Sequence, residues 1–121
     1  MPLVDQSAQA SVRQLLQDRR INARLPLRLP LRMTRIGGQT GVYDATLLSR
    51  DISTIGVYFL SPKRLDPGTA VELEVALVDR PLEHGKVRLA TVGQVVRTDI
   101  TDTPGWHGLA IRFDEISFHY E

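Results

Sequence analysis

Cysteine is absent from this chain of 121 residues, and its absence excludes disulfides, zinc–thiolate sites and thiol nucleophiles. No apolar run approaches the roughly 18 residues that a membrane-spanning helix needs. The N-terminal segment MPLVDQSAQASVRQLL also lacks the charged start and apolar core of a signal peptide. These absences predict a cytoplasmic protein without membrane insertion.

Lysine is nearly absent as well, because it occurs only at Lys63 and Lys86 and every other cationic residue is arginine. Arginine carries a flat, permanently charged fork that binds phosphate at two points and stacks on aromatic rings. A GC-rich genome gives the same preference, so composition alone leaves both explanations open. The formal net charge of +1 argues against a partner that is a nucleic-acid polymer, since such binders show a larger basic excess.

Recognisable catalytic and metal sites are also missing from the sequence. His84, His107 and His119 show no spacing typical of metal ligands. The chain has no GxxxxGK[ST] phosphate loop and no GxSxG serine, and no base that would activate Ser53 is identifiable. We therefore predict no catalytic residues, no metal, no cofactor and no enzymatic activity.

Alternation of apolar and polar residues dominates the chain after residue 24 and predicts β-strands. The predicted strands cover residues 25–34, 42–51, 55–62, 71–77, 86–100 and 107–116. Six short strands are too many for one flat sheet in so small a chain, whereas a closed barrel buries their apolar faces and removes most edges. The predicted fold is an all-β, six-stranded antiparallel β-barrel.

Several residues refine this prediction. Pro26 and Pro30 lie on one face of the first predicted strand and cannot donate to a ladder, so that part should be a sheet edge or irregular. Around Gly93 the alternation of apolar and polar residues shifts by one position, which indicates a bulge or sharp bend. Helix formers at residues 7–18 predict a short helix or flexible arm over residues 1–18, attached to a barrel domain over residues 19–121.

Two polar segments should meet at the open end of the first hairpin. If the GGQTG turn centres on Gln39, residue i faces residue 78 − i, and the linker 20–24 falls beside residues 51–56. An arginine fork donates to guanine O6 and N7 or to phosphate, and a carboxylate accepts from guanine N1 and N2. The two segments together therefore suit a guanine base and its phosphates. By itself, the linker is more typical of a solvated basic segment, and Asp51 and Ser53 also suit turn capping.

The segment RRINAR, which carries RxxxR, and the segment DISTIG, which fits [D/N]xSxxG, together resemble the PilZ family of bacterial cyclic di-GMP receptors. Both motifs occur in the family's order and separation. The resemblance extends from about Arg19 to Phe113, through SPKRLDPGTAVELEVAL, VGQVVR and GLAIRF. It implies a six-stranded barrel with the ligand wrapped across its surface.

The residues that the resemblance assigns to the ligand are Arg19, Arg20, Arg24, Asp51, Ser53 and Gly56. By this resemblance, the two arginines of RxxxR clamp phosphates and guanine edges, and the carboxylate and hydroxyl of the second motif read a guanine. The glycine of that motif keeps the turn open for close approach. Arg19 matches a variable position at which a long basic side chain accompanies binding of a stacked ligand dimer.

The function implied by the resemblance is a non-enzymatic receptor that binds cyclic di-GMP, signals by ordering its N-terminal linker and acts on a downstream protein partner. The alternative is a PilZ-like protein-interaction adaptor with weak or no nucleotide binding. A barrel for single-stranded nucleic acid would need several outward aromatic rings beside a basic groove, and an aromatic content of 6% argues against it.

Overall fold

The structure is a computed structural model that describes residues 24–40, 46–79 and 86–120. These residues form seven strands and no helix: β1 (Pro30–Ile36), β2 (Gln39–Thr40), β3 (Leu47–Ile52), β4 (Gly56–Ser61), β5 (Ala70–Asp79), β6 (Lys86–Ile100) and β7 (His107–Tyr120). The helix predicted at residues 7–18 lies outside the described residues, and so do Arg19 and Arg20. The domain boundary at residue 19 stays a prediction.

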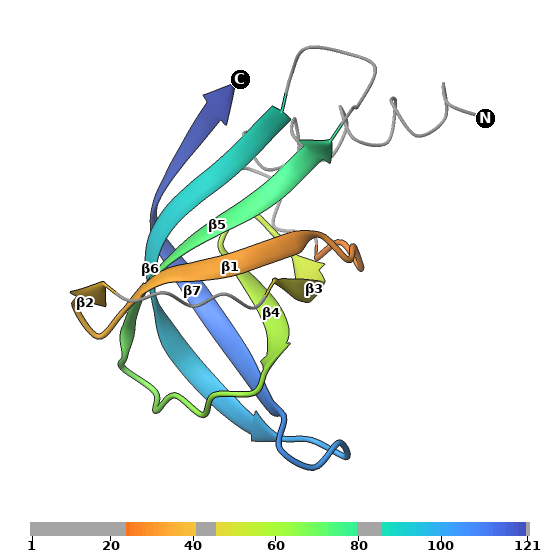
Figure 1. The fold of residues 1–121 in the computed structure, drawn as a ribbon, viewed down its shortest axis with the longest axis vertical. Helices are drawn as coiled ribbons and strands as arrows, with labels where there is room; N and C mark the ends of the chain where they lie inside the picture. Colours follow the sequence, from red (N-terminus) through yellow and green to blue (C-terminus); the bar gives the residue numbers. More distant parts are fainter. Residues whose placement is uncertain (1–23, 41–45, 80–85, 121) are drawn as a thin grey trace.

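Six of the strands close into an antiparallel barrel, as predicted (Figure 1). Their order around the barrel is β1-β3-β4-β7-β6-β5, and β5 returns to pair with β1 from Leu31↔Val75 to Ile36↔Val71. This last pairing closes the ring. Among the described strands, β2 pairs with β1 alone, at the turn where the sequence predicted no strand.

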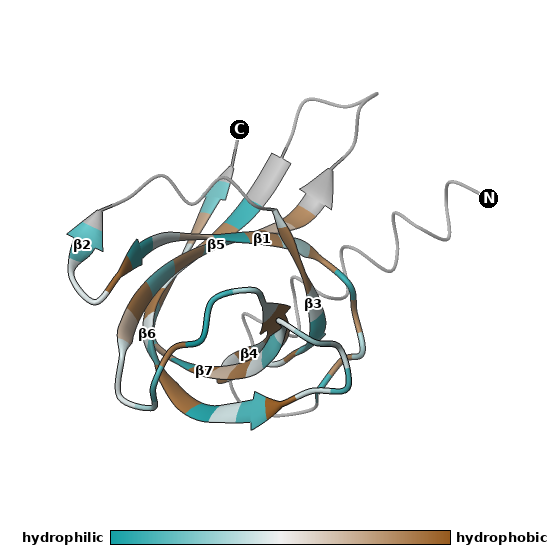
Figure 2. Ribbon diagram, turned by 60° about the horizontal axis from the view of Figure 1, so that its bottom comes forward, coloured by the Kyte–Doolittle hydropathy of each residue, from teal (hydrophilic) through white to brown (hydrophobic). Residues whose placement is uncertain are grey.

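The core fills the inside of this ring with the apolar face of each strand. In β5 the buried Val71, Leu73 and Val75 alternate with Glu72 and Glu74 on the outside. The same alternation appears along the other strands as brown and teal bands (Figure 2). The largest fully buried side chains are Phe59, Ile52, Leu73, Leu77, Leu89, Leu109 and Ile111.

The first predicted strand is wrong in its first half. Residues 25–29 are irregular, and β1 begins only at Pro30, because neither Pro26 nor Pro30 has an amide hydrogen for a ladder. The hydroxyl of Ser49 bridges the gap: its Oγ accepts from Leu29 N at 2.8 Å and donates to Leu27 O. The irregular segment that the two prolines predicted is therefore confirmed, and a serine of β3 holds it in place.

The predicted hairpin register is confirmed. Pro30 faces Leu48 and Leu31 faces Leu47, as the 78 − i rule requires. β3 begins at Leu47, and residues 41–45 of the longer strand predicted there lie outside the described residues. β6 has the predicted bounds, whereas β7 continues past residue 116 to Tyr120.

Gly93 lies at a bulge, as its position in the apolar pattern predicted. The register of β6 against β7 shifts between Val92 and Gly93. A Cβ at Gly93 would lie 2.2 Å from the carbonyl oxygen of Arg112, which is backbone and has little freedom to move. β6 and β7 can therefore approach this closely only because residue 93 has no side chain.

We expect Gly93→Ala to lower the free energy of unfolding by about 1–3 kcal/mol, because the new methyl group overpacks the contact between β6 and β7. Urea denaturation of the variant and the parent protein measures this difference. Val96→Ala is the control, since Val96 is 48% exposed on the same strand and its truncation should change the free energy of unfolding by less than about 0.5 kcal/mol. Equal stability of the Gly93→Ala variant and the parent would contradict the close approach.

Candidate functional site

The described end of the arginine linker is bound to the second motif through backbone hydrogen bonds. Leu25 N donates to Ile52 O at 2.8 Å, and Ile52 N donates to Leu25 O at 3.0 Å. This isolated bridge pairs the residue after Arg24 with the residue after Asp51. The two motifs therefore meet at the end of the hairpin, within one residue of the predicted register.

A bulge in β3 turns the carboxylate of the second motif outward. Ser49 faces Phe59 and Asp51 faces Tyr58, so Arg50 is the extra residue between two register positions. Without the bulge, strict alternation would direct Asp51 inward with Ser49. The bulge instead leaves Arg50 and Asp51 both accessible and returns Ile52 to the core.

Arg24 and Asp51 form an ion pair across this junction, although they are 27 positions apart. The Nη1 of Arg24 donates to Oδ1 of Asp51. The two side chains are 50% and 30% exposed, so the pair lies open to solvent. The structure thus places a guanidinium fork and a carboxylate side by side, which is the juxtaposition that the two motifs predicted.

Ser53 lies in the turn that follows and has a local structural role. It is 1% exposed, its Oγ accepts from Ile55 N at 3.2 Å, and its backbone N donates to Gly56 O at 2.9 Å. The turn-capping role considered for Ser53 is therefore observed, whereas Asp51 pairs with Arg24 instead. No described residue accepts the hydroxyl proton of Ser53, so the turn keeps one hydrogen-bond donor.

Gly56 is needed for a close approach by β7. A Cβ at this position would lie 2.3 Å from the carbonyl oxygen of Ile111, and Gly56 pairs directly with Arg112. Residue 56 must therefore be glycine in the structure because the backbone of β7 lies too close for a side chain. A close approach by a ligand at the same glycine stays a prediction.

Beside Asp51, the outer face of the barrel carries a polar cluster that the sequence analysis did not single out. Tyr58, which faces Asp51 across β3 and β4, donates from its hydroxyl to Asp99 Oδ2 at 3.1 Å. The guanidinium of Arg97 lies 5.6 Å from the centre of the Tyr58 ring and donates to Asp99 at 3.1 Å. Strand alternation does predict that Tyr58 points outward if Phe59 points inward, and the structure shows this arrangement.

On the other side of Arg50 lies a hollow of about 300 Å³, which we call the Trp106 surface. Its main side chains are Arg28, Leu48, Arg50, Leu60 and Trp106. Leu48 is 50% and Trp106 38% exposed, and neither arginine has an ion pair with a described residue. Trp106 is therefore part of an accessible surface. The 78 − i rule makes Arg28 and Arg50 neighbours, but no motif marked them as functional.

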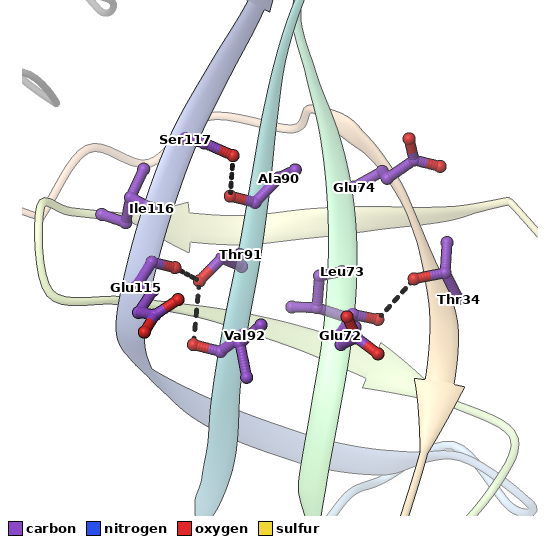
Figure 3. A pocket seen from close by; sticks show the side chains of 10 residues that line it. All are labelled: Thr34, Glu72, Leu73, Glu74, Ala90, Thr91, Val92, Glu115, Ile116 and Ser117. Atoms are coloured by element: carbon purple, nitrogen blue, oxygen red, sulfur yellow. Dashed lines mark hydrogen bonds between the residues drawn. The ribbon is translucent and has the colours of Figure 1, made fainter. Parts of the chain in front are cut away.

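A hollow of about 460 Å³ lies elsewhere, on β1, β5, β6 and β7 (Figure 3). Its hydroxyl groups bond to backbone oxygens of neighbouring strands, such as Thr91 Oγ1 to Glu115 O at 2.6 Å. Two of its carboxylates are already paired, Glu72 with Arg35 and Glu74 with Arg32. These contacts join the strands to one another, and the hollow contains no residue of either motif.

Residues 24–40, 46–79 and 86–120 contain no cluster of three or more His, Asp or Glu side chains placed to hold a metal ion. The same part of the chain has no helix that is long and apolar enough to cross a membrane. The candidate site is therefore the junction of Arg24, Asp51 and the Ser53 turn.

Comparison with solved structures shows that the fold is PilZ-like. The structure of the Bacillus subtilis inhibitor of motility (MotI/DgrA) superimposes with a TM-score of 0.61 and 17% sequence identity. The match covers 79% of this chain and 43% of that protein, so the chain spans less than half of its length. No protein-family model matches the sequence, and no curated protein matches it.

The environment of Tyr58 gives a prediction on pH. Burial raises the pKa of the Tyr58 phenol above its ordinary value of 10.0, and the hydrogen bond to Asp99 raises it further. The neutral phenol therefore stabilises the fold fully below about pH 10, and this contribution is lost as the pH rises through the raised pKa, because the unfolded chain ionises first.

The measurement is the free energy of unfolding of the protein and of Tyr58→Phe from about pH 8 to about pH 11. We expect the protein to lose stability relative to the variant above about pH 10. Parallel profiles over the whole range would contradict a shifted phenol.

Proposed function

We propose that this protein is a non-enzymatic receptor for cyclic di-GMP, which binds where the arginine linker meets the DISTIG turn. The observation that carries the proposal is the pairing of Arg24 with Asp51 at a backbone bridge between segments far apart in the sequence. One group is a bidentate donor suited to phosphate or to guanine O6 and N7, and the other accepts from guanine N1 and N2.

The ion pair is weak enough for a ligand to replace. An exposed pair of this kind contributes about 0.2–1 kcal/mol, whereas a hydrogen bond to a charged group contributes about 1.5–3 kcal/mol. A phosphate that engages Arg24 and a guanine that engages Asp51 would each offset the loss of the pair. Before binding, the pair keeps both groups at the junction, which lowers the cost of ordering them around the ligand.

In this proposal Arg19 and Arg20 complete the clamp on the phosphates, and Ser53 and Gly56 shape the turn on which a guanine rests. Binding would then hold the linker of residues 19–24 against the barrel, and this ordering is the signal to a downstream protein. The proposal includes a cytoplasmic location, where a receptor of this kind meets its second messenger. It requires no cofactor and no metal.

A second candidate function is a protein-interaction adaptor with weak or no nucleotide binding. The Trp106 surface favours it, because exposed Leu48 and Trp106 beside two arginines suit an apolar and acidic segment of another protein. Aromatic rings and arginines are the side chains most enriched where partners bind. The two functions are compatible, since the surface lies beside the junction and shares β3 with it.

The test is isothermal titration with cyclic di-GMP, with GMP as the control ligand. We expect saturable binding that is selective for the cyclic dinucleotide. Arg24→Ala should weaken it by about 10- to 150-fold, because at least one charge-assisted hydrogen bond worth about 1.5–3 kcal/mol is lost. The free energy of unfolding should fall by no more than about 1 kcal/mol, since the lost ion pair is exposed.

Arg64→Ala is the matched control, because Arg64 also forms an exposed ion pair, with Asp66, outside the candidate site. It should bind cyclic di-GMP like the parent protein. A folded Arg20→Ala/Arg24→Ala variant that binds as tightly as the parent would exclude the proposed site. A folded parent protein that does not bind cyclic di-GMP would leave the adaptor as the supported function.

A further inference from the structure

Among the described residues, the last part of β7 has a neighbouring strand on one side only. β4 pairs with β7 only as far as Gly56↔Arg112, and one further hydrogen bond joins Phe113 N to Ile55 O at 2.8 Å. From Glu115 to Tyr120, β7 is paired with β6 on one side, and no described residue pairs with its other side. In Figure 1 the dark-blue end of β7 extends past β4 with β6 along a single edge.

From Glu115 on, this edge has few of the features that usually prevent strands from pairing with other chains. Such edges are protected by proline, by charged side chains and above all lysine, by a bulge or by a very short strand. The bulge lies only at the start of the edge, where Asp114 has no partner on β6, and Glu115 is the one carboxylate among residues 115–120. Residues 114–120 contain no proline and no lysine. The register against β6 is regular from Glu115 to Tyr120. The edge is therefore long and regular enough to accept another strand.

The sequence of the edge is complementary to itself in one antiparallel register. With a two-fold axis at Ser117, Ile116 of one chain faces Phe118 of the other, and Glu115 faces His119. Ile116 and Phe118 pack against the core on one face of the sheet, while Glu115, Ser117 and His119 are exposed on the other. Apolar pairs and polar pairs would thus continue each face across the axis.

Neighbouring registers are less favourable. An axis at Ile116 would place Asp114 opposite Phe118, a charge against an apolar ring. An axis at Phe118 would place Ile116 opposite Tyr120 but Ser117 opposite His119, which leaves Glu115 without a favourable partner. The register centred on Ser117 gives every residue from 115 to 119 a suitable partner and places Asp114 opposite Tyr120 at its ends, and register follows such matches.

We propose that a second copy of this chain docks on this edge, so that the two β7 strands pair antiparallel about Ser117 and the sheet continues through the dimer. The contact is isologous, as expected for a two-fold dimer. It is small, so the dimer should dissociate on dilution. The pairing uses neither Arg24 nor Asp51 and does not rest on the proposed ligand.

The first experiment is cross-linking without cyclic di-GMP. The chain has no cysteine, so Ser117→Cys introduces a single thiol. Residues that face each other in an antiparallel pair have Cα atoms about 4.5–5.5 Å apart, which suits a disulfide. Mild oxidation should give a covalent dimer of Ser117→Cys but not of Asp102→Cys, a control in the exposed loop before β7. Equal cross-linking of both variants, or of neither, would overturn the proposal.

The second experiment measures the dissociation constant of the dimer by sedimentation equilibrium. His119→Glu should weaken it about 2- to 30-fold, because two symmetric pairs of like charges then face each other. Adding Glu115→Lys to this variant should restore the affinity, since opposite charges again meet. Both side chains are exposed, so neither change disturbs the core. The pairing would be refuted if the protein were a monomer at every concentration, or if His119→Glu left the dissociation constant of the dimer unchanged.

Discussion

The site depends on the position of β1 between two neighbours. β1 pairs with β3 on one side and with β5 on the other, and this double pairing closes the barrel. Because the strand is held on both sides, the residues before it have a fixed direction of approach. Before β1, Pro26 and Pro30 have no amide hydrogen to donate to a neighbouring strand. The hydroxyl of Ser49 instead accepts from Leu29 N and donates to Leu27 O. The linker therefore arrives at the end of β3 with Arg24 beside Asp51.

A second constraint acts on the other motif. The bulge at Arg50 rotates the end of β3, so that Asp51 becomes accessible while Ile52 stays in the core. The close approach of β7 at Gly56 holds the following turn against the barrel wall. Rigid barrel elements thus position the carboxylate, whereas the arginine is held mainly by one exposed ion pair and one bridge. Such an arrangement combines a preformed acceptor with a donor that a ligand can recruit at little cost.

Much of the fold was predictable because period-two alternation directly reflects which face of a strand is buried. The barrel, the bounds of β6 and the bulge at Gly93 followed from it, and the hairpin register followed from centring the GGQTG turn on Gln39. The residue at which β1 begins did not follow from alternation, which continues through Pro26, and the two prolines indicated only that this part is a sheet edge or irregular. The meeting of Arg24 with Asp51 followed from the register. The polar cluster around Tyr58 was not predictable. Asp99 lies 41 positions after Tyr58 in the sequence, and no local pattern indicates that the two side chains meet.

The central claim is that cyclic di-GMP binds at the junction of the two motifs, and an NMR titration of the ¹⁵N-labelled protein tests it most directly. The account predicts that the ligand shifts the amide resonances of Leu25, Ile52 and Ile55 and the side-chain resonance of Arg24, while Leu73 and Leu89 on the far wall stay unchanged. Saturable shifts confined to another face of the barrel, or no shifts at a ligand concentration that saturates related receptors, would contradict it.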